Sequence, residues 1–147
     1  MSSQICVDAS LALKLVLDEE DSEKAHALWA GWVAAGTEVM APCHLGFEVT
    51  SVIRNHVARG EISAQAGRAA FEAILAQGIQ LVHPDVLLER AWELAEQFGR
   101  PTAYDACYLA LGEMAGCELW TADRRLYQAV RGALPWVKWL GDYEPSP

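Results

Sequence analysis

The sequence lacks the features of membrane and secreted proteins. No apolar run approaches the roughly 20 residues that a transmembrane helix needs. The N-terminus leads almost directly into an expected strand, without a basic segment followed by an apolar one, so no signal peptide is expected. Internal repeats and low-complexity segments are also missing. We therefore expect a cytoplasmic protein that does not enter a membrane.

Closely spaced cysteines are missing as well. Cys6, Cys43, Cys107 and Cys117 are far apart in the chain, form no CxxC pair and lie among apolar residues. This spacing predicts free, buried thiols rather than a disulfide framework. A zinc site that includes Cys43 and His44 is disfavoured, because no further cysteine or histidine stands at a zinc-ligand spacing.

Basic charge is scarce. The chain has 11 lysines and arginines against 20 aspartates and glutamates, which gives a net charge of −9. Proteins that bind nucleic acids non-specifically usually carry a basic stripe, so the balance argues against that class. An acidic surface suits a basic protein partner. A nucleic-acid enzyme is not excluded, because carboxylates that hold cations do not add to the surface charge.

What the chain does have is a regular alternation of apolar runs and amphipathic segments. Its 147 residues, 52% of them hydrophobic, favour a single globular domain over residues 1–147. The apolar runs predict strands at residues 4–8, 38–41, 79–83, 117–121 and 136–140. The remaining periodic segments predict helices at residues 10–18, 22–35, 43–59, 63–77, 85–98, 102–115 and 123–132. Residues from about 142 to 147 are expected to form a loose tail.

Alternating strands and helices predict an α/β fold with a central parallel sheet and helices on both of its faces. Open sheets of this kind bind ligands beyond the carboxyl ends of their strands. Asp8 and Asp123 both directly follow expected strands. They would face the same crevice if those two strands are neighbours.

Asp105, near the start of the helix at 102–115, and Glu48, inside the helix at 43–59, complete a set of four carboxylates. Three members have ordinary structural explanations. Asp8 and Asp123 suit the N-caps of the helices that follow them. Asp105, as the third helical residue after a Thr102 cap, would be stabilised by the helix dipole.

Glu48 is harder to explain structurally. It lies at the edge of the apolar stripe formed by Leu45, Val49 and Ile53. A half-buried carboxylate needs a partner, and the candidates are Arg54, Arg59 or a cation shared with the aspartates. A set of oxygen ligands without ordered histidines and cysteines favours Mg²⁺ or Mn²⁺ over zinc. Such an ion polarises a phosphodiester and generates a hydroxide nucleophile, so a metal-dependent phosphodiesterase is the leading hypothesis.

These residues and their surroundings resemble a known family. Val7-Asp8-Ala9-Ser10, the helical Glu48, Tyr104-Asp105-Ala106 and Thr121-Ala122-Asp123 together resemble the PIN-domain ribonucleases, and within them the VapC-like toxins of toxin–antitoxin pairs. The resemblance covers nearly the whole chain. It implies a three-layer α/β/α sandwich with a central parallel sheet of about four to five short strands.

The resemblance also implies an activity and its residues. Asp8, Glu48, Asp105 and Asp123 match the acidic quartet that binds Mg²⁺ or Mn²⁺ and activates water in this family. Ser10 and Thr121 match supporting hydroxyl positions that orient carboxylates or waters. The implied function is endonucleolytic cleavage of single-stranded RNA or RNA loops. The implied partners are a cognate antitoxin protein and a second copy of the chain in a homodimer.

The match is incomplete at one position. The family commonly has Asn three residues after the helical Glu, whereas this chain has Ser51, whose side chain reaches less far. Asn55, one turn further along the helix, lies at nearly the same angle and could replace it.

Several further residues are candidates for contacts with RNA or protein. Arg124 and Arg125 directly follow Asp123, and Lys14 lies within two helical turns of Asp8, so these three are expected to contact RNA phosphates. Trp29 and Trp32 suit either core packing or anchoring of the antitoxin.

Two other functions remain open. A non-catalytic PIN-fold module that binds a protein would explain the acidic charge. A phosphohydrolase of the haloacid-dehalogenase type needs a second aspartate two residues after the first, and that position is Ser10.

Overall fold

The computed structural model describes residues 3–146. Its strands are β1 (Gln4–Val7), β2 (Glu38–Pro42), β3 (Gln80–Val82), β4 (Glu118–Thr121) and β5 (Val137–Trp139). Its helices are α1 (Ala9–Lys14), α2 (Ser22–Ala35), α3 (Leu45–Ala58), α4 (Ala64–Ala76), α5 (Leu87–Gln97), α6 (Tyr104–Ala115) and α7 (Arg124–Val130), with a short 3₁₀ helix, η1, at Leu140–Asp142. In these described residues, no helix is both long and apolar enough to cross a membrane.

The five strands form one parallel sheet in the order β3-β2-β1-β4-β5. The chain therefore starts in the middle of the sheet, where β1 pairs with β2 on one side and β4 on the other. The order reverses direction at β1, and ligands of open α/β sheets bind beside such a reversal. The predicted parallel α/β fold with four to five short strands is confirmed.

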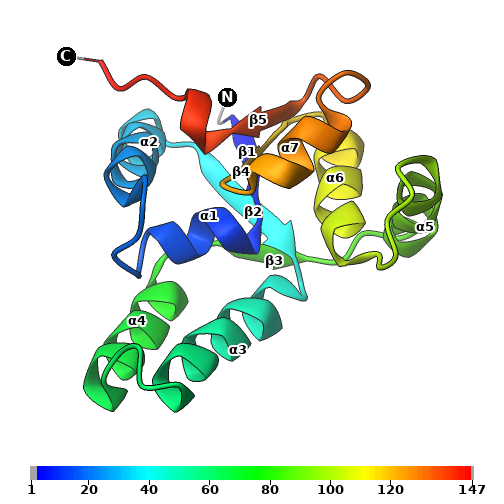
Figure 1. Cartoon of the computed structure of the whole chain (residues 1–147). Coiled ribbons are helices and arrows are strands. Elements are labelled where there is room, and N and C mark those ends of the chain that lie inside the picture. The colour runs from blue at the N-terminus through cyan, green and yellow to red at the C-terminus, as the bar shows by residue number, and fades with distance from the viewer. Residues whose placement is uncertain (1–2, 147) are drawn as a thin grey trace.

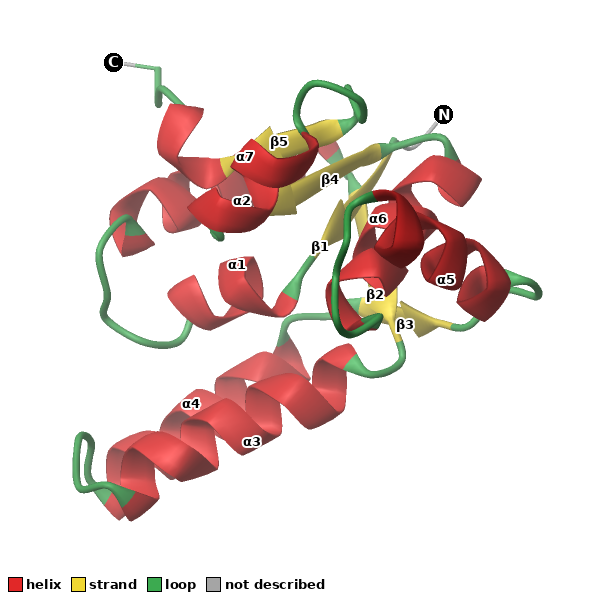
Figure 2. Cartoon of the chain, turned by 45° about the vertical axis from the view of Figure 1, so that its right-hand side comes forward, coloured by secondary structure: helices red, strands yellow, loops and turns green. Residues whose placement is uncertain are grey.

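Helices cover both faces of the sheet (Figure 1). Figure 1 shows α1 and α2 on one side of the strands, and α5, α6 and α7 on the other. The three-layer arrangement predicted from the sequence is therefore present. The helices α3 and α4 pack against each other and extend away from the sheet as a hairpin (Figure 2).

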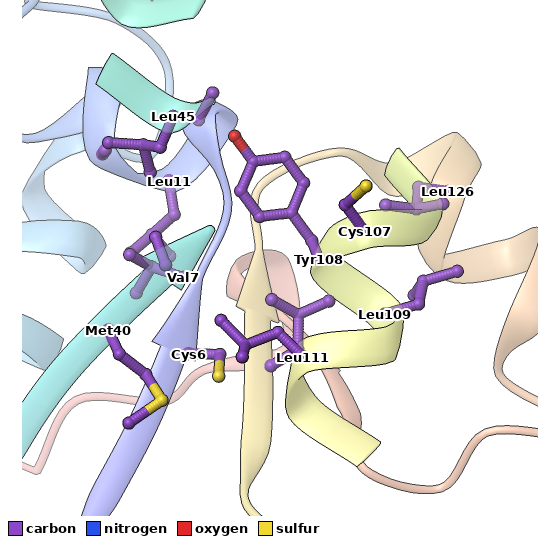
Figure 3. Close-up of a cluster of buried hydrophobic side chains, with 14 of the residues drawn as sticks. Cys6, Val7, Leu11, Met40, Leu45, Cys107, Tyr108, Leu109, Leu111 and Leu126 are labelled. Carbon is purple, nitrogen blue, oxygen red and sulfur yellow. The ribbon is translucent and has the colours of Figure 1, made fainter. Parts of the chain in front are cut away.

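The core lies between β1 and α6. Figure 3 shows Cys6 of β1 beside Leu111 of α6, with Tyr108 further along that helix, and Val7 on the other side of β1 beside Leu11 of α1. All five side chains are buried. The strand β1 is buried on both faces, as is usual for a central parallel strand, and its apolar run follows from that position. This packing holds the end of β1, and so Asp8, in a fixed place.

Two local expectations were wrong. The helix expected at 10–18 ends at Lys14. The residues that follow form a turn that Ser22 holds: its hydroxyl donates to the Leu17 carbonyl and accepts from the Glu19 amide. Thr102 does not cap α6. Ala103 occupies the N-cap position, without a side-chain hydrogen bond.

The C-terminal segment is partly packed onto the domain. Leu140 is buried, and the Lys24 ammonium on α2 donates to the Gly141 carbonyl at 2.8 Å. The Tyr143 ring lies 6.1 Å from the Trp120 ring in an edge-on arrangement. Residues 144–146 are exposed.

Candidate functional site

Asp8 stands at the carboxyl edge of the sheet, immediately after β1. It is the N-cap of α1, as expected of an aspartate there, and its Oδ1 accepts from the Leu11 amide at 3.0 Å. The Ser10 hydroxyl donates to the same oxygen at 2.7 Å. Thr121, the last residue of β4, donates a short hydrogen bond to Oδ2. Both carboxylate oxygens are therefore oriented by hydroxyls from neighbouring segments.

The two hydroxyls are themselves fixed by backbone groups. The Ala122 amide donates to the Ser10 oxygen, and the Asp123 amide donates to the Thr121 oxygen, both at 2.9 Å. The two hydroxyl oxygens lie 3.2 Å apart. This network joins the ends of β1 and β4, so the predicted adjacency of these strands is confirmed. Ser10 and Thr121 occupy the supporting positions expected from the sequence.

Burial changes the acidity of Asp8. Only 4% of the residue is exposed. The pKa of Asp8 is raised to about 6, chiefly by removal from water and to a smaller extent by the charge of Asp105. Hydrogen bonds from Thr121, Ser10 and Leu11 act in the opposite direction and lower it. A cation near Asp8 would reverse this effect, because it favours the ionised carboxylate.

Glu48 faces α6 rather than an arginine of its own helix. The hydroxyl of Tyr108 donates to its Oε1 at 3.3 Å, and His44 Nε2, one turn earlier on α3, lies 3.0 Å from the same oxygen. Figure 3 shows the Tyr108 hydroxyl directed toward α3, near Leu45. Within residues 3–146, neither of the two candidate arginine partners, Arg54 and Arg59, pairs with Glu48.

Tyr108 is buried beside Glu48. Its pKa is raised first by that burial and then by the charges of Glu48, Asp8 and Asp105. Tyr108 was not predicted as a site residue, and His44 was considered only for zinc. Tyr108 is three residues after Asp105 and His44 is four before Glu48, which are the spacings of neighbours on a helix face.

Asp105 is engaged in an ion pair. It is the second residue of α6, and its Oδ2 accepts from the guanidinium of Arg100 at 3.0 Å. Arg100 lies in the loop before α6 and was also missed. Arg100 lies five residues before Asp105, and most of the residues between them form a loop. No helical spacing in the sequence therefore predicts that the two side chains meet.

Asp123 serves as the N-cap of α7, and its Oδ1 accepts from the Leu126 amide at 3.1 Å. Within residues 3–146, Asp123 is linked to Asp8 through the Thr121 hydroxyl, which accepts from the Asp123 amide and donates to Asp8. Across residues 3–146, no three histidine, cysteine, aspartate or glutamate side chains are gathered in a ready metal-binding group. The four predicted carboxylates come from four segments: Asp8 follows β1, Glu48 is on α3, Asp105 is on α6 and Asp123 follows β4.

The hydrogen bonds of residues 3–146 include none from the side chains of Ser51 and Asn55, and both residues are exposed. Neither supports Glu48, and Tyr108 provides the hydrogen bond to it instead.

The candidate RNA-contacting residues differ in availability. Arg124 and Arg125 are exposed at the start of α7, and the Arg124 guanidinium lies over the Trp139 ring at 5.5 Å from its centroid. Lys14 is mostly buried and lies 3.9 Å from Glu19.

The two tryptophans of α2 pack edge-on against each other, with ring centroids 5.9 Å apart. Trp32 is buried and also contacts Trp120, whereas Trp29 is half-buried. Core packing, one of the two predicted roles, therefore describes Trp32.

Comparison with known proteins identifies the family. The PIN domain model matches residues 5–132. The chain belongs to the PIN domain family. Over 131 residues it is 30% identical to VapC ribonuclease Mb0985 of Mycobacterium bovis, which covers 89% of this chain and 94% of that protein. The predicted likeness to VapC-type PIN ribonucleases is confirmed.

Solved PIN structures share the fold. PAE2754 from Pyrobaculum aerophilum aligns with a TM-score of 0.68 at 20% identity, over 96% of this chain and 93% of that one. VapC20 of Mycobacterium tuberculosis, described as a toxin that cleaves the sarcin–ricin loop, aligns with a TM-score of 0.63 at 20% identity, over 88% of this chain and 95% of that one.

Proposed function

We propose that this PIN domain is a Mg²⁺- or Mn²⁺-dependent endoribonuclease, the toxin of a toxin–antitoxin pair, that cleaves single-stranded RNA or structured RNA loops. One observation carries the proposal. In a chain whose relatives are named ribonucleases, Asp8 is a buried carboxylate at the carboxyl edge of the sheet, and Ser10 and Thr121 donate hydrogen bonds to its oxygens. The carboxyl edge of an open α/β sheet is where such folds place their chemistry.

The donor set fits a hard divalent cation. It consists of carboxylate oxygens, and Mg²⁺ needs only one or two protein carboxylates, with water and substrate phosphate oxygens completing its shell. Asp8 is buried and its pKa is raised. A nearby cation would lower that pKa, because it stabilises the ionised carboxylate. We assign Asp8, Glu48 and Asp105 as the ligands, with Asp123 on the neighbouring loop as the fourth.

The ion would supply Lewis acidity toward the phosphodiester and lower the pKa of a bound water. The protein's own part is orientation. Ser10 and Thr121 hold the two oxygens of Asp8, and Tyr108 holds Oε1 of Glu48. Fixed carboxylates do not have to reorganise during the reaction, which is how a preorganised site lowers a barrier.

Arg124 and Arg125 are the proposed phosphate contacts. They are exposed, and they follow directly on Asp123. Lys14 is a weaker third contact because it lies beside Glu19. With a net charge of −9, the chain depends on such local basic residues to hold RNA.

Exposed apolar side chains support protein partners. Leu88 and Trp92 on α5 are 60% and 67% exposed, and Val33 on α2 is 66% exposed. Large exposed apolar groups often mark interaction surfaces. We propose a cognate antitoxin and a second copy of the chain as these partners, with RNA cleavage taking place in the cytoplasm.

The test is cleavage of defined RNAs by the purified protein with Mg²⁺ or Mn²⁺, and with a chelator. A ribosomal RNA fragment that contains the sarcin–ricin loop belongs among the substrates, because VapC20 is described as cleaving that loop. We expect metal-dependent internal cleavage that is lost in Asp8→Asn and Asp105→Asn. Equal activity in the wild type and both variants would refute the proposal.

A non-catalytic binding module is the second candidate. The ion pair between Arg100 and Asp105 favours it, because a paired carboxylate needs no metal. Such a module would show no shift in melting temperature with Mn²⁺, and it would bind its protein partner equally well after Asp8 and Asp105 are neutralised.

A further inference from the structure

Cys6 and Cys117 form a thiol pair. Their sulfur atoms lie 3.4 Å apart, although 111 positions separate them in the sequence. Cys6 belongs to the central strand β1, two residues before Asp8, and Cys117 directly precedes β4. Because β1 and β4 are hydrogen-bonded neighbours, the pair bridges two strands.

The two thiols differ in their surroundings. Cys6 is fully buried, whereas Cys117 is partly exposed. Cys117 lines a surface hollow of about 660 Å³ together with Gly112, Glu118 and Trp136. Cys117 is therefore the member of the pair that borders solvent, whereas Cys6 is not among the residues that line the hollow.

The contact between their sulfur atoms distinguishes Cys6 and Cys117 from the other cysteines. The other two cysteines lack such a neighbour. Cys43 is exposed, contrary to the prediction of a buried thiol, and Cys107 is buried; within residues 3–146 neither forms a hydrogen bond with another thiol.

We propose that Cys6 and Cys117 are a peroxide-oxidised modification site, at which an intramolecular disulfide forms. Cys117 attacks one oxygen of hydrogen peroxide, the O–O bond breaks, and a sulfenic acid and water result. Cys6 then attacks the sulfenic sulfur, an S–S bond forms and a second water leaves with the thiol proton. Overall, two thiols and one peroxide give one disulfide and two waters. Sulfur is oxidised and the peroxide oxygens are reduced.

The pair is suited to both steps. The accessible thiol is the one that must meet the peroxide, and the buried thiol is already in contact with the sulfur that it must attack. A sulfenic acid at Cys117 would thus be resolved within the same molecule, before further peroxide oxidises it to a sulfinic acid.

The test treats the folded wild-type protein with hydrogen peroxide, unfolds it, alkylates the remaining thiols and measures the intact mass. We expect two of the four cysteines to become unreactive together, a peptide that links Cys6 to Cys117, and full recovery with dithiothreitol. In Cys117→Ser, Cys6 should remain alkylatable. The matched control Cys107→Ser removes a different, buried thiol and should still form the link.

Three outcomes would overturn the proposal. The first is over-oxidation of Cys117 while Cys6 still alkylates. The second is cross-linking between chains through Cys43 with no internal link. The third is loss of Cys6 alkylation in Cys117→Ser. Circular dichroism of each variant before oxidation shows whether it is folded, and Cys6→Ala provides a second variant that should also fail to form the link.

Discussion

At the scale of single residues, Asp8 carries the strongest physical signal. Its two oxygens accept hydrogen bonds from Ser10, Leu11 and Thr121, yet its pKa still rises to about 6, because burial outweighs them. The N-cap role of Asp8 was predicted from the sequence, and so was its support by the two hydroxyls. The same side chain therefore caps α1 and is a ligand in the proposed metal site.

The first prediction concerns Asp8→Asn and pH. A raised pKa means that the folded state holds the proton more tightly than the unfolded chain, so the stability of the wild type falls as the pH rises from about 4 through about 6. The variant lacks this ionisation. At neutral pH without metal it should be more stable than the wild type, by up to about 3 kcal/mol.

Urea denaturation of both proteins in chelating buffer measures the difference. The gap in the free energy of unfolding should close as the pH falls from 6 to about 4. A gap that stays constant over this range would mean that the Asp8 carboxyl ionises normally.

The second prediction concerns Tyr108→Phe. The change removes only the hydroxyl that donates to Glu48. The fold should survive with a loss of about 1 kcal/mol of stability. The Mn²⁺ concentration for half-maximal RNA cleavage should rise about tenfold or more, because groups that orient metal ligands have effects of that size.

Tyr127→Phe is the matched control, because Tyr127 stacks on Trp139 near β5 and has no hydrogen bond to a carboxylate within residues 3–146. If both variants have the same Mn²⁺ dependence as the wild type, Tyr108 does not position Glu48.

At the scale of elements, the α3–α4 hairpin depends on one close approach. A methyl group added at Gly67 of α4 would lie 2.2 Å from Cγ2 of Val57 on α3. Gly67→Ala should therefore destabilise the protein by about 1–3 kcal/mol, since the helices must separate. Gly31→Ala on α2, where nothing lies within 4 Å, should instead stabilise it by about 0.5–1 kcal/mol.

Thermal unfolding of the two variants gives the comparison. Opposite signs are expected. If Gly67→Ala is as stable as Gly31→Ala, the hairpin is not tightly packed at this point.

The elements also show what the sequence could and could not predict. Apolar periodicity located the five strands and the helices α1–α7, and missed η1. Ser63 caps α4 by accepting from the Ala66 amide, an interaction between residues close in the chain. The end of α1 was misplaced because Ser22 determines it through contacts outside the helix.

Partners from other elements could not be predicted in the same way. Tyr108 reaches Glu48 across 60 positions of sequence, and only the packing of α6 beside α3 brings them together. The sequence therefore indicated the carboxylates but not the groups that hold two of them.

At the scale of the whole molecule, the C-terminal segment closes the domain. Leu140 is buried, and Lys24 holds the Gly141 carbonyl, whereas residues 144–146 are exposed. A chain that ends at Tyr143 should match the wild type to within about 0.5 kcal/mol. A chain that ends at Trp139 should lose more than about 2 kcal/mol, because a buried leucine and its neighbours are removed.

Urea denaturation of both truncated proteins tests this. Equal stability of the two would show that η1 does not contribute to the fold.

The whole molecule is also acidic, so the proposed chemistry depends on the carboxylate edge and not on a general affinity for RNA. The most direct measurement compares single-turnover RNA cleavage by the wild type, Asp8→Asn and the control Asp85→Asn, an exposed aspartate before α5, across a Mn²⁺ series. We predict a rate that rises with Mn²⁺ and saturates in the wild type and Asp85→Asn. In Asp8→Asn it should fall by more than about 100-fold. Cleavage by Asp8→Asn at the wild-type rate and with the same Mn²⁺ dependence would contradict the account.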